Sequence, residues 1–133
     1  MNKYFSLIYL SLFFIAFCGS FYLFTLPGSS LPNIYWLNIP YLDKYIHIGI
    51  FFTLCFTAAI AWKVINRGKI NLVVAIGIVL FFISYGIGIE FYQENYVEGR
   101  AFELFDIAAD SLGCILFLSW FVIGGFAKKS WSR

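Results

Sequence analysis

The only histidine of this 133-residue chain follows an aspartate by four residues, near the start of a long apolar segment. Asp43 and His47 are therefore expected to share one face of a helix, whereas the adjacent Asp43 and Lys44 are expected to point apart. An imidazole is the side chain used most often as a general acid or base. Asp43 can also cap the helix and Lys44 can extend to water, so His47 is the residue that most needs a polar partner.

A second polar group, Glu90 and Gln93, lies toward the end of another apolar segment. Together with Gly86 these residues recur at intervals of four and three, so they form one stripe along a helix. Glycine in such a stripe lets a neighbouring helix approach closely. Because the C-terminal end of a helix disfavours anions, we expect a group from elsewhere to compensate Glu90 and Glu94.

The third group is Asp106 and Asp110, which share a helix face with Gly113. If this helix begins near residue 102, Asp110 lies roughly 10 Å along its axis at ~1.5 Å per residue. A carboxylate at such a depth in an apolar segment is costly unless it is paired. Arg100, in the preceding loop, is the expected counter-charge.

The composition indicates what surrounds these groups. Hydrophobic residues make up 62% of the chain and charged residues 12%, whereas soluble domains average about 45–50% and about 25%. This balance argues against a water-soluble fold, since too little polar surface is available to coat one. The basic residues form no continuous stripe, so a nucleic-acid partner is not expected.

Four apolar stretches reach the length of about 20 residues that a helix needs to cross a bilayer. They run roughly over residues 4–26, 43–65, 70–94 and 102–127. Helices are predicted because open strands cannot satisfy their backbone groups in lipid. The chain shows no internal repeat, so residues 1–133 are predicted to form a single all-α integral membrane domain.

The basic residues predict the orientation of these helices. Seven of the nine fall on one side of the predicted membrane: Lys3, Lys63, Arg67, Lys69, Lys128, Lys129 and Arg133. The positive-inside rule places that side, and both termini, in the cytoplasm. The seven acidic residues and His47 then lie at the outer ends of the second, third and fourth helices or in the outer loops. Tyr35 and Trp36, in the first outer loop, suit the lipid headgroup region.

In their order and spacing these motifs resemble those of the VanZ-like membrane proteins. The motifs are Asp43-Lys44-x-x-His47, Glu90-x-x-Gln93, and Gly99-Arg100 followed by Asp106-x-x-x-Asp110-x-x-Gly113. The resemblance covers residues 43–113 and implies a small multi-pass protein of the bacterial cytoplasmic membrane, from a family named for resistance to the glycopeptide antibiotic teicoplanin. The residues of these motifs define a predicted outer polar pocket: Asp43, Lys44, His47, Glu90, Gln93, Arg100, Asp106 and Asp110. The chain departs from the family at Asp110, where the family often has asparagine, so this pocket is expected to be more acidic here.

Three functions remain open on these residues. In the first, the outer polar pocket binds an amphiphile: a lipid headgroup, a lipid-linked cell-wall precursor, or a glycopeptide or lipoglycopeptide antibiotic. Lys44 and Arg100 would bind the phosphate group of a phosphate-bearing amphiphile. In the second, the chain is an enzyme acting on a lipid or lipid-linked substrate, although no motif selects a reaction. In the third it is a lipid transporter or scramblase, which would require the charged stripe to continue across the membrane, and the sequence does not continue it.

A purely structural interpretation also stands beside these three, in which buried ion pairs and hydrogen bonds fix helix packing. No cofactor and no metal ion is predicted, because the chain has one histidine and no recognised ligand motif. In the enzyme hypothesis, four residues would serve as general acids, general bases or ligands of an oxygen-preferring divalent ion: His47, Glu90, Asp106 and Asp110.

Overall fold

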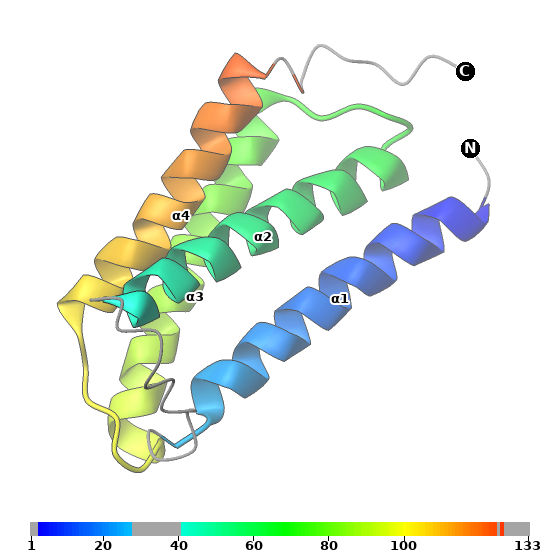
Figure 1. Ribbon diagram of the computed structural model, residues 1–133. Helices are drawn as coiled ribbons and strands as arrows, with labels where there is room; N and C mark the ends of the chain where they lie inside the picture. The colour runs from blue at the N-terminus through cyan, green and yellow to red at the C-terminus, as the bar shows by residue number, and fades with distance from the viewer. Residues whose placement is uncertain (1–2, 28–40, 125, 127–133) are drawn as a thin grey trace.

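The computed structural model describes residues 3–27, 41–124 and 126, which form four α-helices and no strand (Figure 1). The helices are α1 (Lys3–Thr25), α2 (Leu42–Ile65), α3 (Leu72–Tyr96) and α4 (Leu104–Ile123). Each is long and apolar enough to cross a membrane, as the lengths of the apolar runs predicted. The predicted end of α2 at residue 65 matches the structure, and the other boundaries are displaced by one to four residues, most at the end of α4, which stops at Ile123 rather than near residue 127.

Local hydrogen bonds account for where the helices begin and end. The side chain of Asn71 accepts a hydrogen bond from the Val74 N–H at 2.9 Å, so α3 begins after this cap rather than at residue 70. Gly124 ends α4, and its N–H donates to the Trp120 carbonyl at 2.8 Å. In the loop between α3 and α4, Gly99 has a φ of 74°, a left-handed conformation that glycine adopts without strain.

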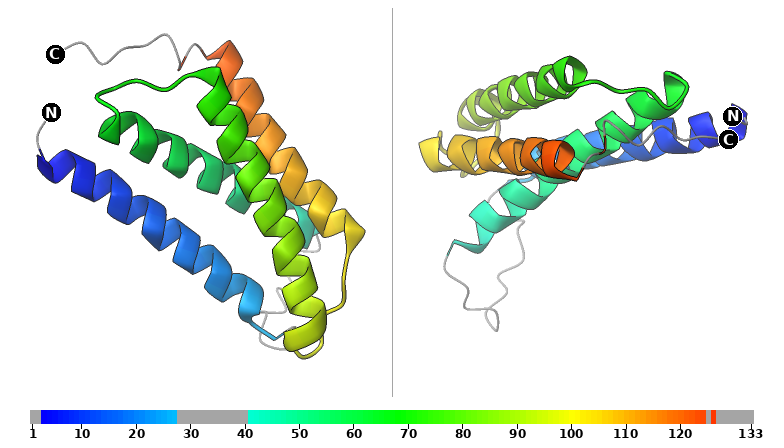
Figure 2. Two further views of the ribbon diagram at one scale, coloured as in Figure 1. Left: turned by 180° about the vertical axis from the view of Figure 1, so that it is seen from behind. Right: turned by 90° about the horizontal axis from the view of Figure 1, so that it is seen from above.

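The most extensive helix contact is between α2 and α4, which begin at the same end of the bundle and cross obliquely (Figure 2). A Cβ atom at Gly113 of α4 would overlap the carbonyl oxygen of Ile48 in α2 and lie 3.1 Å from the Phe51 side chain. The bare backbone of Gly113 therefore sets the closeness of this crossing. Helix α1 packs mainly on α2, and α3 packs mainly on α4.

The bundle has an aromatic core and an apolar exterior. Phe51, Phe82 and Phe117 are almost fully buried, whereas Val73 is 76% exposed and Ile123 is 85% exposed. Water would not favour so many exposed apolar side chains, and lipid tails would cover them. With four candidate spans, these features indicate a multi-pass membrane protein.

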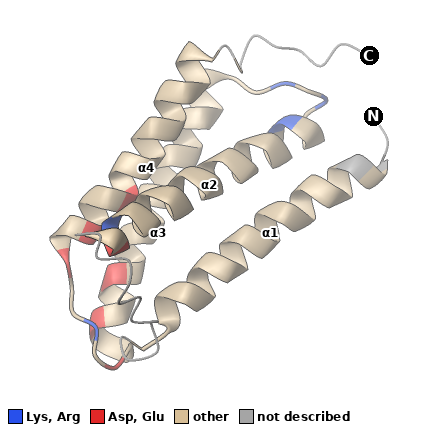
Figure 3. Cartoon of the chain, in the orientation of Figure 1, with Lys and Arg blue, Asp and Glu red and all other residues tan. Residues whose placement is uncertain are grey.

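Charge is divided between the two ends of the bundle. Figure 3 shows the acidic residues gathered where α2 and α4 begin and where α3 ends. Lys63, Arg67 and Lys69 lie at the other end, where α2 ends. Several residues of the sequence-based predictions lie outside the described part of the chain, namely Tyr35, Trp36, Lys128, Lys129 and Arg133, as does the side chain of Lys3.

Candidate functional site

Lys44 joins the start of α2 to the start of α4 through three carboxylates. Its Nζ lies 2.9 Å from Asp43 Oδ2 and 2.6 Å from Glu103 Oε2, and it also donates to Asp106 Oδ1. The Asp106 side chain is buried, whereas those of Asp43 and Glu103 are 58% and 53% exposed. Both helices present their N-terminal ends here, where the helix dipole favours carboxylates.

The contacts of Lys44 correct two expectations. Asp43 and Lys44 do not point apart, because the flexible lysine stem lets the ammonium group return to the neighbouring carboxylate. Tyr41, rather than Asp43, occupies the N-cap position of α2, and Asp43 lies in the first turn of the helix. The second correction concerns Arg100: within the described residues, Lys44 rather than Arg100 makes the ion pair with Asp106.

His47 lies one turn deeper in α2 and faces both aspartates of α4. Its Nδ1 is 2.8 Å from Asp110 Oδ1, and its Nε2 is 3.9 Å from Asp106 Oδ2. All three side chains are buried, and the imidazole ring packs on Phe24 of α1 with ring centroids 4.9 Å apart. Asp110 is thus paired with His47, and not with Arg100 as expected from the sequence.

Gly86 makes room for the second oxygen of Asp110. A Cβ atom at Gly86 would stand only 2.7 Å from Asp110 Oδ2. This oxygen is buried and receives no hydrogen bond from the described residues. The close approach of α3 at Gly86 therefore encloses the Asp110 carboxylate on the side away from His47.

Glu90 of α3 is fully buried, and its carboxylate points toward His47 and Asp106. Its Oε2 accepts a hydrogen bond from the Glu103 backbone N–H at 3.0 Å, while Oε1 has no hydrogen-bond partner among the described residues. The start of α4 is therefore the group that compensates this carboxylate at the end of α3. The Glu94 side chain, unlike that of Glu90, is exposed, so it is not enclosed by the other helices.

Gln93 and Arg100 have other surroundings. The buried Gln93 amide donates to the Phe24 carbonyl oxygen at 2.9 Å, which ties the last turn of α1 to α3. Arg100 is partly buried in the loop before α4, and its Nε–H makes no hydrogen bond with the described residues. Of the eight polar residues selected from the sequence, six meet through a chain of contacts: Asp43, Lys44, His47, Glu90, Asp106 and Asp110.

A groove of about 700 Å³ runs along α2 and α4 beside these contacts. Asp43, Lys44 and Glu103 form its charged end. Its remaining wall is mainly apolar and includes Ile48, Phe105, Ala108 and Leu112. Sequence reasoning did not place Glu103 in the site, although its position three residues before Asp106 at a helix start was a usable signal. The apolar wall had no distinct signal, because such residues occur throughout the chain.

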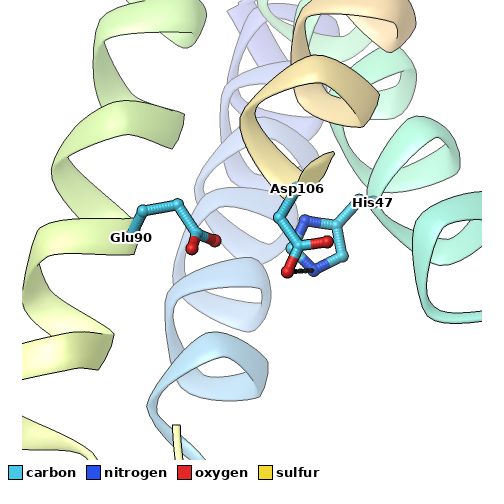
Figure 4. Close-up of side chains that lie close together, drawn as sticks. All are labelled: His47, Glu90 and Asp106. Atoms are coloured by element: carbon cyan, nitrogen blue, oxygen red, sulfur yellow. Dashed lines mark ion pairs between the residues drawn. The ribbon is translucent and has the colours of Figure 1, made fainter. Parts of the chain in front are cut away.

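The arrangement can exchange protons or hold a cation. Ligand atoms of His47, Glu90 and Asp106, each from a different helix and each buried, all lie within 4.8 Å of one another (Figure 4). A second acidic group, Asp43 with Glu103 and Asp106, is the one that surrounds Lys44. Comparison of the chain with protein families, curated proteins and solved structures gave no match.

Proposed function

We propose that this chain is a VanZ-like protein of the bacterial cytoplasmic membrane that binds an amphiphile at its outer face. In this orientation both termini are cytoplasmic, and the acidic end of the bundle faces outward. The placement of Lys63, Arg67 and Lys69 at the opposite end supports this orientation through the positive-inside rule. The amphiphile is a lipid headgroup, a lipid-linked cell-wall precursor or a glycopeptide antibiotic with its acyl chain.

The observation that carries the proposal is the two-part lining of the groove along α2 and α4. Asp43, Lys44 and Glu103 offer ionic contacts at one end, and Ile48 and Leu112 lie on the apolar wall. A lipid has the same division between a polar headgroup and an apolar chain. A site that is largely apolar with a few placed polar groups is also the usual form of a small-molecule pocket.

The charges at the groove restrict the headgroup. Lys44 already faces three carboxylates, so a phosphate reaches it by displacing the exposed Glu103 side chain. Asp43 and Glu103 in turn suit an ammonium group. Arg100 does not line the groove, and as a cation in the loop entering α4 it is available to a phosphate there. A headgroup with both an amine and a phosphate therefore fits best.

Native mass spectrometry of the detergent-purified chain tests the proposal. The probes are phosphatidylethanolamine, phosphatidylglycerol, undecaprenyl phosphate and teicoplanin, each added to delipidated protein. Ala108→Trp fills the groove without changing a charged residue, and Ser84→Trp on an exposed face of α3 is the matched control. We expect a bound amphiphile on the wild type and the control, and its loss from Ala108→Trp. Equal binding by all three proteins refutes the groove as the site.

A second variant addresses the phosphate. Arg100→Gln is expected to weaken binding of phosphate-bearing probes by about tenfold, the effect of losing about 1.4 kcal/mol of interaction. Glu98→Gln, in the same loop and exposed, is the control for a change of charge alone. Unchanged binding of every phosphate-bearing probe by Arg100→Gln removes Arg100 from the headgroup contact.

The His47–Asp110 pair favours a second candidate function, a membrane enzyme acting on a lipid-linked substrate. A histidine bonded to a buried carboxylate through Nδ1 keeps Nε2 oriented for proton transfer. Conversion of fluorescent lipid or lipid-linked substrates by the wild type, and its loss in His47→Gln, would support catalysis. Binding without turnover by both proteins would leave only the amphiphile-binding function.

A further inference from the structure

Three side chains from three helices converge inside the acidic end of the bundle, and Figure 4 shows how they face one another. His47 belongs to α2, Glu90 to α3 and Asp106 to α4, and their ligand atoms lie within 4.8 Å of one another. Around a tetrahedral zinc ion, with metal–ligand distances of ~2.0–2.2 Å, ligand atoms are ~3.3–3.6 Å apart. The His47 Nε2 and Asp106 Oδ2 atoms, 3.9 Å apart, are close to that spacing.

An unpartnered carboxylate oxygen is the independent sign that this space takes a cation. Glu90 is 0% exposed, and its Oε1 receives no hydrogen bond from the described residues. The Glu90 carboxylate is directed toward Asp106 and His47 (Figure 4). Buried charged groups in proteins are either paired or coordinate a metal ion. A metal ion between these residues would give Glu90 Oε1 a partner that the described protein atoms do not provide.

Each of the three side chains is also held through an atom that a metal would not need. Glu90 Oε2 accepts the Glu103 N–H, and Asp106 Oδ1 accepts from Lys44. His47 Nδ1 is bonded to Asp110, which leaves Nε2 facing Asp106. In metal sites, a histidine usually binds the metal through one ring nitrogen and donates the N–H of the other ring nitrogen to a group such as a carboxylate.

The net charge of the clustered side chains also favours binding of a cation. The carboxylates gathered here are those of Asp43, Glu90, Glu103, Asp106 and Asp110. Lys44 is the one lysine among them, and His47 adds at most one further positive charge. With all five carboxylates ionised, the negative charge exceeds this positive charge by at least three, and a divalent ion would reduce that excess by two.

We infer that His47, Glu90 and Asp106 bind one divalent transition-metal ion, of the Zn²⁺ or Mn²⁺ class, with Asp110 as a positioning residue for the imidazole. One nitrogen and two carboxylate oxygens suit these ions better than Ca²⁺, which takes six to eight oxygen ligands in typical sites, or Mg²⁺, which keeps several waters. Three protein ligands leave coordination positions for water or for an oxygen of a bound molecule. This inference does not depend on the proposed amphiphile function.

Metal content of the full-length chain in detergent is the direct test. The protein is treated with a chelator, reloaded with ZnCl₂ or MnCl₂, desalted, and analysed by inductively coupled plasma mass spectrometry. We expect about one ion per chain for the wild type and background for His47→Gln, Glu90→Gln and Asp106→Asn. Glu94→Gln, exposed and one turn farther along α3, is the matched control that keeps the ion.

Three further measurements keep the test decisive if one of these variants folds poorly. The wild type alone is heated with and without Zn²⁺ or Mn²⁺, and the ion that binds is expected to raise its Tm. Asp110→Asn is expected to weaken metal affinity about 10- to 100-fold while leaving the stoichiometry at saturation unchanged. It should also shift the visible spectrum of the Co²⁺-loaded protein. A wild type that retains no ion and gains no thermal stability from either metal overturns the inference.

The exposed carboxylates of Asp43 and Glu103 provide a second control. The double variant Asp43→Asn with Glu103→Gln removes the two exposed carboxylates of the other acidic group and should keep the ion. Loss of the ion from this variant with retention in Glu90→Gln would place the metal at these exposed carboxylates and refute the buried site. Ala108→Trp should retain the metal while losing the amphiphile, so the two proposals can fail separately.

Discussion

Glu90 in α3 accepts a hydrogen bond from the backbone N–H of Glu103, the residue after which α4 begins, at 3.0 Å. Glu103 provides no side-chain cap of its own to α4. One side chain therefore closes the start of a helix that is 13 residues distant in the sequence. The contact also fixes the axial position of α3 relative to α4, because a shift of either helix along its axis would break this hydrogen bond.

Removing this carboxylate should destabilise the start of α4. Glu90→Ala leaves a backbone N–H without its acceptor, a change that costs about 1–3 kcal/mol. Glu90→Gln should lose less, since the amide oxygen can still accept the same hydrogen bond. The free energy of unfolding in detergent, with chelator present, measures both. Glu94→Ala is the matched control, and an equal loss in that exposed position would contradict the contact.

The crossing of α2 and α4 gives a second prediction. Gly113→Ala places a methyl group against the Ile48 carbonyl oxygen, and overpacking of this kind costs about 1–3 kcal/mol. At Gly88 of α3 a Cβ atom would meet nothing within 4 Å, so Gly88→Ala should be neutral or stabilising. Unfolding of the two variants in denaturing detergent compares them directly. Equal stability would show that α2 and α4 are not in close contact at Gly113.

The buried pair of His47 and Asp110 should behave as one unit. In a double-mutant cycle with His47→Gln and Asp110→Asn, we expect a coupling free energy of about 1–3 kcal/mol. The cycle is followed by thermal unfolding under chelating conditions. A parallel cycle of His47→Gln with Glu94→Gln should be additive within about 0.5 kcal/mol, since Glu94 is exposed on another helix. Additivity in both cycles would show that the His47–Asp110 bond contributes no coupling.

The helices themselves follow from the sequence because their apolar runs exceed the length that a bilayer requires. The exact ends do not, since they depend on single local contacts. Asn71 displaces the start of α3 by two residues through its own side chain, and Gly124 stops α4 although the apolar residues continue to Phe126. Hydropathy describes the segment that prefers lipid, which is not always the segment that is helical.

The faces that the polar residues occupy within each helix were predictable from the sequence, but their partners on the other helices were not. The four-residue spacing of Asp106 and Asp110 places both on one buried face, because the helical period alone decides it. The rotation of one helix against the next is not encoded in such spacing. Lys44 rather than Arg100 therefore emerged as the partner of Asp106 only from the three-dimensional arrangement. The bond from Gln93 to the α1 backbone had no sequence signal for the same reason.

The central position of Lys44 predicts a large effect of its removal. Lys44→Met leaves the buried Asp106 carboxylate without its cation, and breaking a buried pair in this way typically costs about 3–5 kcal/mol. Adding Asp106→Leu to Lys44→Met should recover much of the loss, because the unpaired charge is then absent. Lys69→Met, at an exposed lysine of the opposite end, is the control. A Lys44→Met protein as stable as this control would contradict the role of the ion pair.

The proposed orientation can be tested by chemical labelling. In a chain with Cys18, Cys55 and Cys114 replaced by alanine, Glu98→Cys and Arg67→Cys place single thiols in exposed positions at opposite ends of the bundle. A maleimide that does not cross membranes should label Glu98→Cys on intact spheroplasts, because the acidic end faces outward. Arg67→Cys should react only after the membrane is permeabilised. The reverse pattern would turn the acidic end toward the cytoplasm and would exclude an outer amphiphile site, while leaving the metal site inside the bundle unaffected.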